Sequence, residues 1–194
     1  MRLTVILIAP LFLLSLISCT NSAAYEQKSH MLDSLGGAVS NLAAALQKHD
    51  STELRKYIDQ FGYYSSFIEA SQFDTIGKQD ADQLQDFYRS GNALKKFLEN
   101  RAALLARVAL LNSQYRRLAE DIRNHSISIE EADSYVLKEK KEAAYVVEAG
   151  NQQQQLFYRS LEQYRLSVRD VQQIIKRYNN GQLPTIVNDS IPQL

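Results

Sequence analysis

The residue with the most distinctive chemistry in this chain is Cys19, its single cysteine. A thiol can be acylated, oxidised or bound to a metal, and its surroundings decide which of these occurs. Because no second cysteine is present, the chain can form neither an intrachain disulfide nor a zinc site built from several cysteines. The chemistry of Cys19 therefore has to be inferred from the segment that precedes it.

The residues before Cys19 have the composition of an export signal. Arg2 supplies a short positive start, and residues 3–17 form an apolar run with few interruptions. A transmembrane helix needs roughly 20 apolar residues, and this run is shorter. Residues 1–18 are therefore predicted to be a secretory signal peptide, which is removed from the mature protein.

The last residues of this segment, Leu16-Ile17-Ser18-Cys19, resemble a bacterial lipobox. The resemblance to bacterial lipoproteins implies that Cys19 is lipidated, becomes the first mature residue and carries more than one acyl chain, as stable anchoring requires. Because Thr20 rather than aspartate follows, the sorting rule of these lipoproteins favours the outer membrane, with the protein facing the periplasm or the cell surface. The alternative is an ordinary signal peptide that is cleaved after Ser22-Ala23-Ala24.

The charge balance and the absence of known motifs exclude several classes of function. The chain has 22 Lys and Arg against 22 Asp and Glu, and no basic stripe is evident, so no nucleic-acid partner is expected. No phosphate-binding glycine loop and no Gly-x-Ser-x-Gly nucleophile motif is present. The sequence therefore predicts a protein that is not an enzyme and that has no cofactor.

The three histidines also fail to form a metal-binding pattern. His30, His49 and His125 are not part of the Glu-x-x-His pairs that hold metals in helical bundles. Most clustered carboxylates lie in the first turns of predicted helices, where acids complement the helix dipole. We therefore predict no metal site and no catalytic residue.

The elements that must position these residues are helical. No proline occurs between Pro10 and Pro184, and apolar residues recur every three or four positions. Capping boxes at Asp50–Glu53 and Ser128–Glu131 mark two helix starts. The predicted helices span residues 25–48, 51–70, 80–124 and 128–178, and the third alone would be on the order of 65 Å long.

The short connection at residues 125–127 makes the last two helices antiparallel neighbours. The predicted fold is all-α: an elongated antiparallel three- or four-helix bundle built on a long coiled-coil-like hairpin. The predicted parts are a signal peptide (1–18), a lipidated tether (19–24), a helical bundle (25–180) and a C-terminal tail (181–194), which either packs on the bundle or is disordered.

A polar stretch, residues 151–155, interrupts the apolar seam of the last helix. It is either a solvated helix face or the point where the bundle ends and the two long helices continue alone. In the second case, Arg101 and Asn112 on the preceding helix are expected to pair with it.

The chain has 11 tyrosines and no tryptophan, and tyrosine is enriched at interfaces because it joins a large apolar ring to a polar tip. Many of these rings could instead fill the wide layers of a bundle. The candidate partner-binding residues are Tyr57, Tyr63, Tyr64 and Phe67, with Tyr63 or Tyr64 expected to be exposed.

Two functions remain open. The first is a membrane-anchored module that has a structural role or works through contacts with a protein partner, which predicts a filled core and an exposed apolar or aromatic patch. The second is a bundle that binds a small apolar ligand or lipid near Gly36-Gly37 or Gly150, which predicts an apolar pocket of about 300–1,000 Å³.

Overall fold

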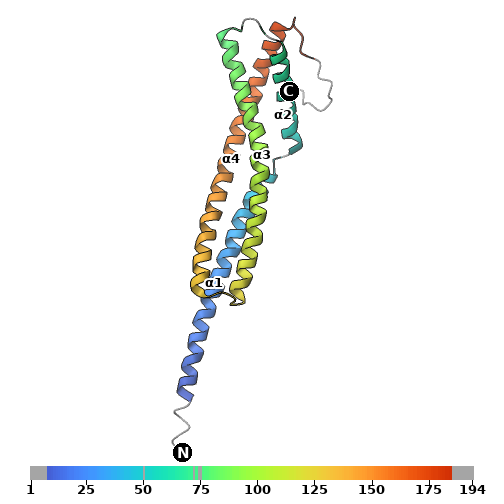
Figure 1. Ribbon diagram of the computed structural model, residues 1–194. Helices are drawn as coiled ribbons and strands as arrows, with labels where there is room; N and C mark the ends of the chain where they lie inside the picture. Colours follow the sequence, from blue (N-terminus) through green and yellow to red (C-terminus); the bar gives the residue numbers. More distant parts are fainter. Residues whose placement is uncertain (1–7, 50, 72, 74–75, 185–194) are drawn as a thin grey trace, which may run out of the picture. The chain divides into compact units, whose positions relative to one another are not determined.

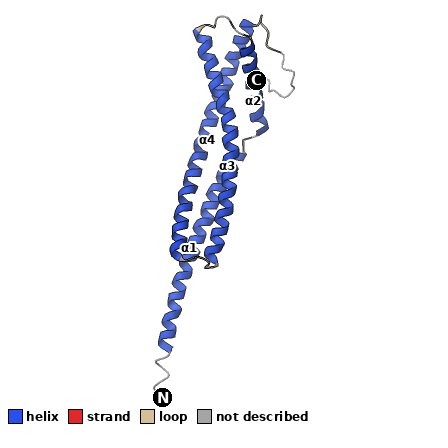
Figure 2. Ribbon diagram, in the orientation of Figure 1, coloured by secondary structure: helices blue, strands red, loops and turns tan. Residues whose placement is uncertain are grey.

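The computed structural model describes residues 8–49, 51–71, 73 and 76–184, with no side-chain description for residues 8–21 and 51. Within these residues the chain consists of helices, without any strand (Figure 1 and Figure 2). The helices are α1 (Ile8–Gln47), α2 (Ser51–Ala70), α3 (Lys78–Arg123) and α4 (Ile129–Tyr178). The predicted all-α helical bundle is confirmed.

Three helices begin and end within a few residues of their predicted bounds, whereas α1 begins at Ile8 instead of Tyr25. No proline or glycine lies between Pro10 and Gly36 to stop it, and Pro10 falls in the first turn of α1, where proline is tolerated. The predicted lipidation site Cys19 lies outside the residues whose side chains are described. Asp50 and most of the predicted tail also lie outside the described residues. No described helix is long and apolar enough to cross a membrane.

The turn between α3 and α4 is closed by two local motifs. His125 adopts a left-handed conformation (φ 54°), and the amides of His125 and Ser126 donate to the carbonyls of Ile122 and Asp121, which forms a Schellman cap. At the start of α4, the Glu131 amide donates to Ser128 Oγ at 3.2 Å, and the Ser128 amide donates to Glu131 Oε2 at 2.9 Å. The predicted capping box is therefore present, and hydrogen bonds from the amide and the side chain of Ser128 to the Glu131 carboxylate lower its pKa.

The chain divides into two compact units. Unit 1 combines Met1–Ala44 with Leu105–Glu148, and unit 2 combines Ala45–Leu104 with Ala149–Leu194. Unit 1 therefore contains most of α1 with the end of α3 and the start of α4. Unit 2 contains α2 with the start of α3 and the end of α4. Each unit is built from three main helical segments.

In unit 1, α1 runs antiparallel to α3. Arg123 donates to Asp33 at 2.6 Å, and Asn112 donates to Ser40 at 3.0 Å, so the numbering rises along α1 as it falls along α3. A Cβ built on Gly36 would stand 3.4 Å from Asn112 Oδ1, so Gly36 faces α3 at van der Waals distance. Lys28, in the middle of α1, forms an ion pair with Asp133 near the start of α4.

In unit 2, an aromatic core joins three helices. Phe61 of α2, Phe87 of α3 and Tyr164 of α4 are buried, with ring centroids 5.1 to 6.4 Å apart. α2 runs parallel to α4, because Tyr164 donates to Gln60 and Gln172 donates to Tyr64. Apolar rings therefore fill the centre of this unit.

The polar stretch of α4 pairs differently from the prediction. Within unit 2, Asn100 donates to Gln153 at 3.1 Å. Arg101 instead donates to the carbonyls of Leu46 and His49 at the end of α1, and Asn112 bonds Ser40 in unit 1. The prediction that Arg101 and Asn112 pair with the glutamines was wrong, because both face α1 and its C-terminal turn.

Candidate partner-binding groove

The four predicted binding residues do not form one exposed face. Tyr57 and Tyr64 are buried, with 5% and 2% of their surface exposed, whereas Tyr63 and Phe67 are half-buried. Burial raises the pKa of Tyr64, whose hydroxyl accepts a hydrogen bond from Gln172 at 3.0 Å. The expected outward ring is therefore Tyr63 rather than Tyr64, and even Tyr63 is only partly exposed.

The hydroxyl of Tyr57 nevertheless reaches the surface between α2 and α4. It accepts hydrogen bonds from Arg165 Nη2 at 2.8 Å and Nε at 3.2 Å, and it donates to Glu53 Oε1 at 3.2 Å. Arg165 also forms an ion pair with Glu53 at 3.6 Å. Three side chains from two helices thus hold one another in a fixed arrangement.

This arrangement lies in a surface groove of unit 2, here called the α2–α4 groove. One part of the groove has a volume of about 200 Å³. A second part, of about 340 Å³, shares Tyr158, Leu161 and Arg165 with the first, so the two are continuous. The remaining lining residues are Lys48, His49, Glu53, Leu54, Tyr57, Phe157, Glu162, Leu166 and Arg169.

His49 forms an aromatic wall at one end of the groove. Its ring centroid lies 4.4 Å from that of Phe157, 5.3 Å from that of Tyr158 and 5.5 Å from that of Phe97. Burial lowers the pKa of His49, and the nearby guanidinium of Arg101 lowers it further. The imidazole therefore favours its neutral form and packs as an aromatic ring.

The far part of the groove exposes apolar surface. Tyr158 and Leu166 of α4 are 61% and 54% exposed, and Leu161 between them is half-buried. Arg169 beside them makes no ion pair with any described residue. Together with tryptophan, tyrosine and arginine are the residues that most often dominate protein–protein binding energy.

Sequence reasoning missed Tyr158, although the helical repeat could have found it. Phe157 lies on the predicted seam, and the next residue of a helix points about 100° away. Because Phe157 is buried in the core, the adjacent ring of Tyr158 must turn toward solvent. His49 was predicted to lie at a helix end, but its aromatic neighbours come from distant parts of the chain.

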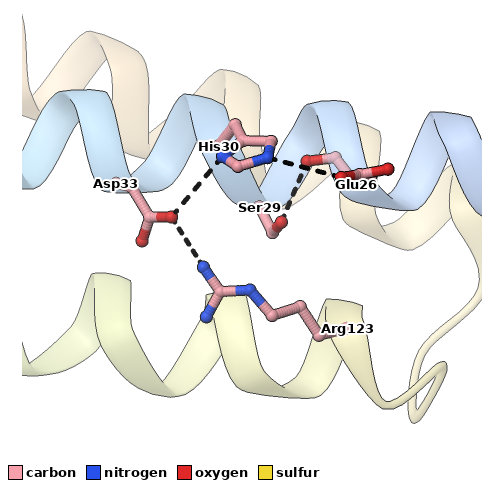
Figure 3. Close-up of polar contacts among 5 residues, drawn as sticks. All are labelled: Glu26, Ser29, His30, Asp33 and Arg123. Atoms are coloured by element: carbon pink, nitrogen blue, oxygen red, sulfur yellow. Dashed lines mark hydrogen bonds and ion pairs between the residues drawn. The ribbon is translucent and has the colours of Figure 1, made fainter.

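A second polar site lies in unit 1, between α1 and α3. His30 is close to the carboxylates of Glu26 (3.7 Å) and Asp33 (3.9 Å), and Arg123 reaches Asp33 from α3 (Figure 3). This cluster is exposed, and no group of three or more metal-binding side chains occurs among the described residues. It is best described as a set of surface ion pairs, which stabilise a fold only weakly.

Next to this cluster, a groove of about 340 Å³ passes Gly36. Its lining includes the polar side chains of Asp33, Asn112 and Arg116, and a purely apolar ligand would leave these groups without hydrogen-bond partners. The lining residues are Leu32, Asp33, Gly36, Ser40, Asn112, Tyr115 and Arg116. Gly150 is buried and lines neither of these two grooves.

Comparison with known proteins assigns no family to this chain. No family model matches it, and neither a curated protein nor a solved structure shows significant similarity to it.

Proposed function

We propose that this protein is a non-enzymatic lipoprotein of the bacterial cell envelope that binds a protein partner through the α2–α4 groove. The lipid on Cys19 anchors it to a membrane. Thr20, the residue after the cysteine, favours the outer membrane. The observation that carries the proposal is the exposed ring of Tyr158 at the rim of a groove whose floor is already ordered.

The side chains of the groove are held in place before binding, and this favours association with a partner. Tyr57, Arg165 and Glu53 are held by mutual hydrogen bonds before any partner arrives. A preformed site loses less conformational entropy on association, so more of the contact energy contributes to affinity. The rim combines an exposed aromatic ring with arginine side chains, and the composition matches that of binding hot spots.

A binding site for a small apolar ligand has weaker support. Such a ligand would need an apolar, largely enclosed cavity. The groove beside Gly36 is lined by Asp33, Asn112 and Arg116, whose polar groups suit contact with water. The buried rings of Phe61, Phe87 and Tyr164 occupy the centre of unit 2. The protein-binding proposal therefore fits the described residues better.

Site-specific photocrosslinking tests the groove. A photoreactive amino acid would replace Tyr158, and in a matched protein it would replace Tyr145, which is 71% exposed on the same helix but lies outside the groove. In intact cells, position 158 should yield a discrete crosslinked product that position 145 does not. Arg165→Ala in the same protein should reduce that product several-fold.

Two further measurements separate binding from stability and anchoring. Tyr158→Ala should leave the melting temperature nearly unchanged, because exposed substitutions usually change stability by less than about 0.5 kcal/mol. Mass spectrometry of the mature N-terminus should find a lipidated Cys19, and Cys19→Ala should release the protein from membranes. Equal crosslinking at positions 158 and 145 would reject the groove, and an unmodified Cys19 would reject the anchor.

A further inference from the structure

We infer that the turn between α3 and α4, residues 124–128, lies against the phospholipid headgroups of the membrane that holds the anchor. The inference rests on the proposed lipidation of Cys19. It adds a second membrane contact, made by a part of the chain that is more than a hundred residues away from the lipid in sequence. The argument uses unit 1 alone.

The first observation is that Tyr25 of α1 contacts this turn. The Tyr25 hydroxyl donates a hydrogen bond to the carbonyl of Ile127 at 3.2 Å. The Tyr25 ring also packs against the imidazole of His125, with centroids 4.2 Å apart. The turn thus lies directly beside residue 25 of α1.

The second observation is that neighbouring contacts fix this arrangement. Lys28 forms an ion pair with Asp133 of α4, and Arg123 of α3 bonds Asp33 of α1 at 2.6 Å (Figure 3). Ser29, between these pairs, is buried. Within unit 1, α1 is therefore held on both sides of the turn, and Tyr25 cannot move away from it without breaking these contacts.

The third observation is the short chain between the anchor and Tyr25. Residues 19–25 belong to α1, and six residues of helix rise about 9 Å. Even a fully extended chain would span at most about 22 Å. A headgroup layer is about 5–8 Å thick on each side of the bilayer. An acylated Cys19 lies at this layer, so the turn beside Tyr25 lies about 9 Å from it while residues 19–25 stay helical, and never more than about 22 Å away.

The chemistry of the turn fits this position. Its exposed side chains include Asn124, His125 and Ser126, which can form hydrogen bonds with phosphate and ester oxygens. The flanking Glu130 and Glu131 are exposed acids, and they oppose binding to an anionic surface. The contact is therefore imposed by the anchor, and zwitterionic headgroups are the lipids that it accommodates best.

Tryptophan fluorescence can test this position, because the natural chain contains no tryptophan. Ser126→Trp places a probe in the turn. Leu110→Trp is the control, since Leu110 is 54% exposed on α3 within the same unit and lies about 20 Å farther along the helix. Both natively lipidated proteins would be reconstituted into phosphatidylcholine vesicles that carry a nitroxide on part of the headgroups.

We expect the probe at position 126 to be quenched at least about threefold more than the probe at position 110. Tyr25→Ala in the Ser126→Trp protein should reduce this difference while the protein stays bound to the vesicles. Asn124→Trp serves as a second turn probe if Ser126→Trp lowers the melting temperature.

Equal quenching at positions 126 and 110, in a sample whose lipidation is verified by mass spectrometry, would overturn this inference and leave the anchor intact. An unmodified Cys19 in the same sample would reject the anchor, and the membrane contact of the turn with it. The two failures are therefore distinguishable.

Discussion

A Cβ built on Gly91 of α3 would stand 2.1 Å from Cδ2 of Phe61 on α2. No side chain can occupy that position while the ring stays in place. The absence of a side chain at residue 91 lets the Phe61 ring pack 5.1 Å from Phe87 and 6.4 Å from Tyr164, measured between centroids. Gly91 is therefore a packing requirement of the aromatic core in unit 2.

Gly91→Ala should destabilise the protein, although alanine is the better helix former by about 1 kcal/mol. The added methyl must displace a buried ring, and overpacking of this kind typically costs about 1–3 kcal/mol. Urea unfolding monitored by circular dichroism would measure the change. A variant at least as stable as the natural protein would show that Phe61 has room to move.

Gly62→Ala is the matched control on the facing helix. A Cβ at Gly62 would meet no atom within 4 Å, so only the helix propensity changes. This variant should gain about 0.5–1 kcal/mol of stability. Opposite signs for the two glycine variants would separate the packing effect from the propensity effect within one experiment.

Ser128→Ala should cost about 0.5–2 kcal/mol, because it removes the hydroxyl that accepts from the Glu131 amide at the start of α4. Ser126→Ala should cost less, since Ser126 lies outside this box and its backbone amide makes the Schellman bond. Thermal unfolding of both variants provides the comparison. Equal losses would mean that the box contributes nothing beyond the turn itself.

The bounds of α2, α3 and α4 could be predicted because the signals that set them are local. The reciprocal bonds of Ser128 and Glu131 involve residues three apart, and an apolar repeat of three or four residues can be recognised without knowledge of the partner helix. The α-helical class follows from the same evidence. The start of α1 was predicted too late, because the polar residues around Thr20 were interpreted as a tether although nothing there stops a helix.

The division into two units could not be predicted in this way. An apolar stripe shows which face of a helix is buried, but it does not show which helix covers that face. The long helices α3 and α4 change partners along their length, from α2 in unit 2 to α1 in unit 1. The single predicted bundle at residues 25–180 therefore gave no indication of two three-helix units.

The candidate site was only partly predictable for the same reason. A buried tyrosine needs a hydrogen-bond partner for its hydroxyl. The partner of Tyr57 is Arg165 and that of Tyr64 is Gln172, and each lies 108 residues away in sequence. Sequence alone placed these rings on one helix but could not pair them with α4. Tyr158 is an exposed residue that the alternation of helix faces could have identified.

Tyr115 should make the stability of the protein fall at high pH. Burial and the carboxylates of Glu139 and Glu142 raise its pKa to about 12, so the folded state favours the neutral phenol. Its contribution is full below pH 10 and is lost as the pH rises toward 12, up to about 3 kcal/mol.

Tyr115→Phe should remove part of this decline and keep the ring. Other tyrosines, including Tyr64 and Tyr88, also have raised pKa values, so the difference between the two proteins is the relevant quantity. Unfolding free energies of both proteins at pH 9 and pH 11 would measure this difference. The same decline in both proteins would show that Tyr115 ionises as freely in the folded state as in the unfolded chain.

His49 should make the stability of the protein fall at acid pH. Burial and the neighbouring Arg101 lower its pKa below the usual value of 6.5, so the folded state favours the neutral imidazole. This contribution to stability is complete above about pH 6.5 and is lost as the pH falls through the lower folded value. Protonation would also place a second positive charge beside Arg101, whose guanidinium donates to the carbonyls of Leu46 and His49. The melting temperature should therefore fall as the pH is lowered from 7 to 5.

His49→Gln should flatten this acid limb, because glutamine does not titrate, while it lowers the melting temperature at pH 7 through the lost contacts with Phe97 and Phe157. His30→Gln is the control, since His30 is exposed on α1 and its ion pairs are of the surface kind, which contribute little. Nuclear magnetic resonance of the imidazole protons would assign the titration directly, with a midpoint for His49 below 6.5. If His49→Gln kept the full loss of stability at low pH, that loss would come from other titrating groups, and the protonation of His49 would have no part in it.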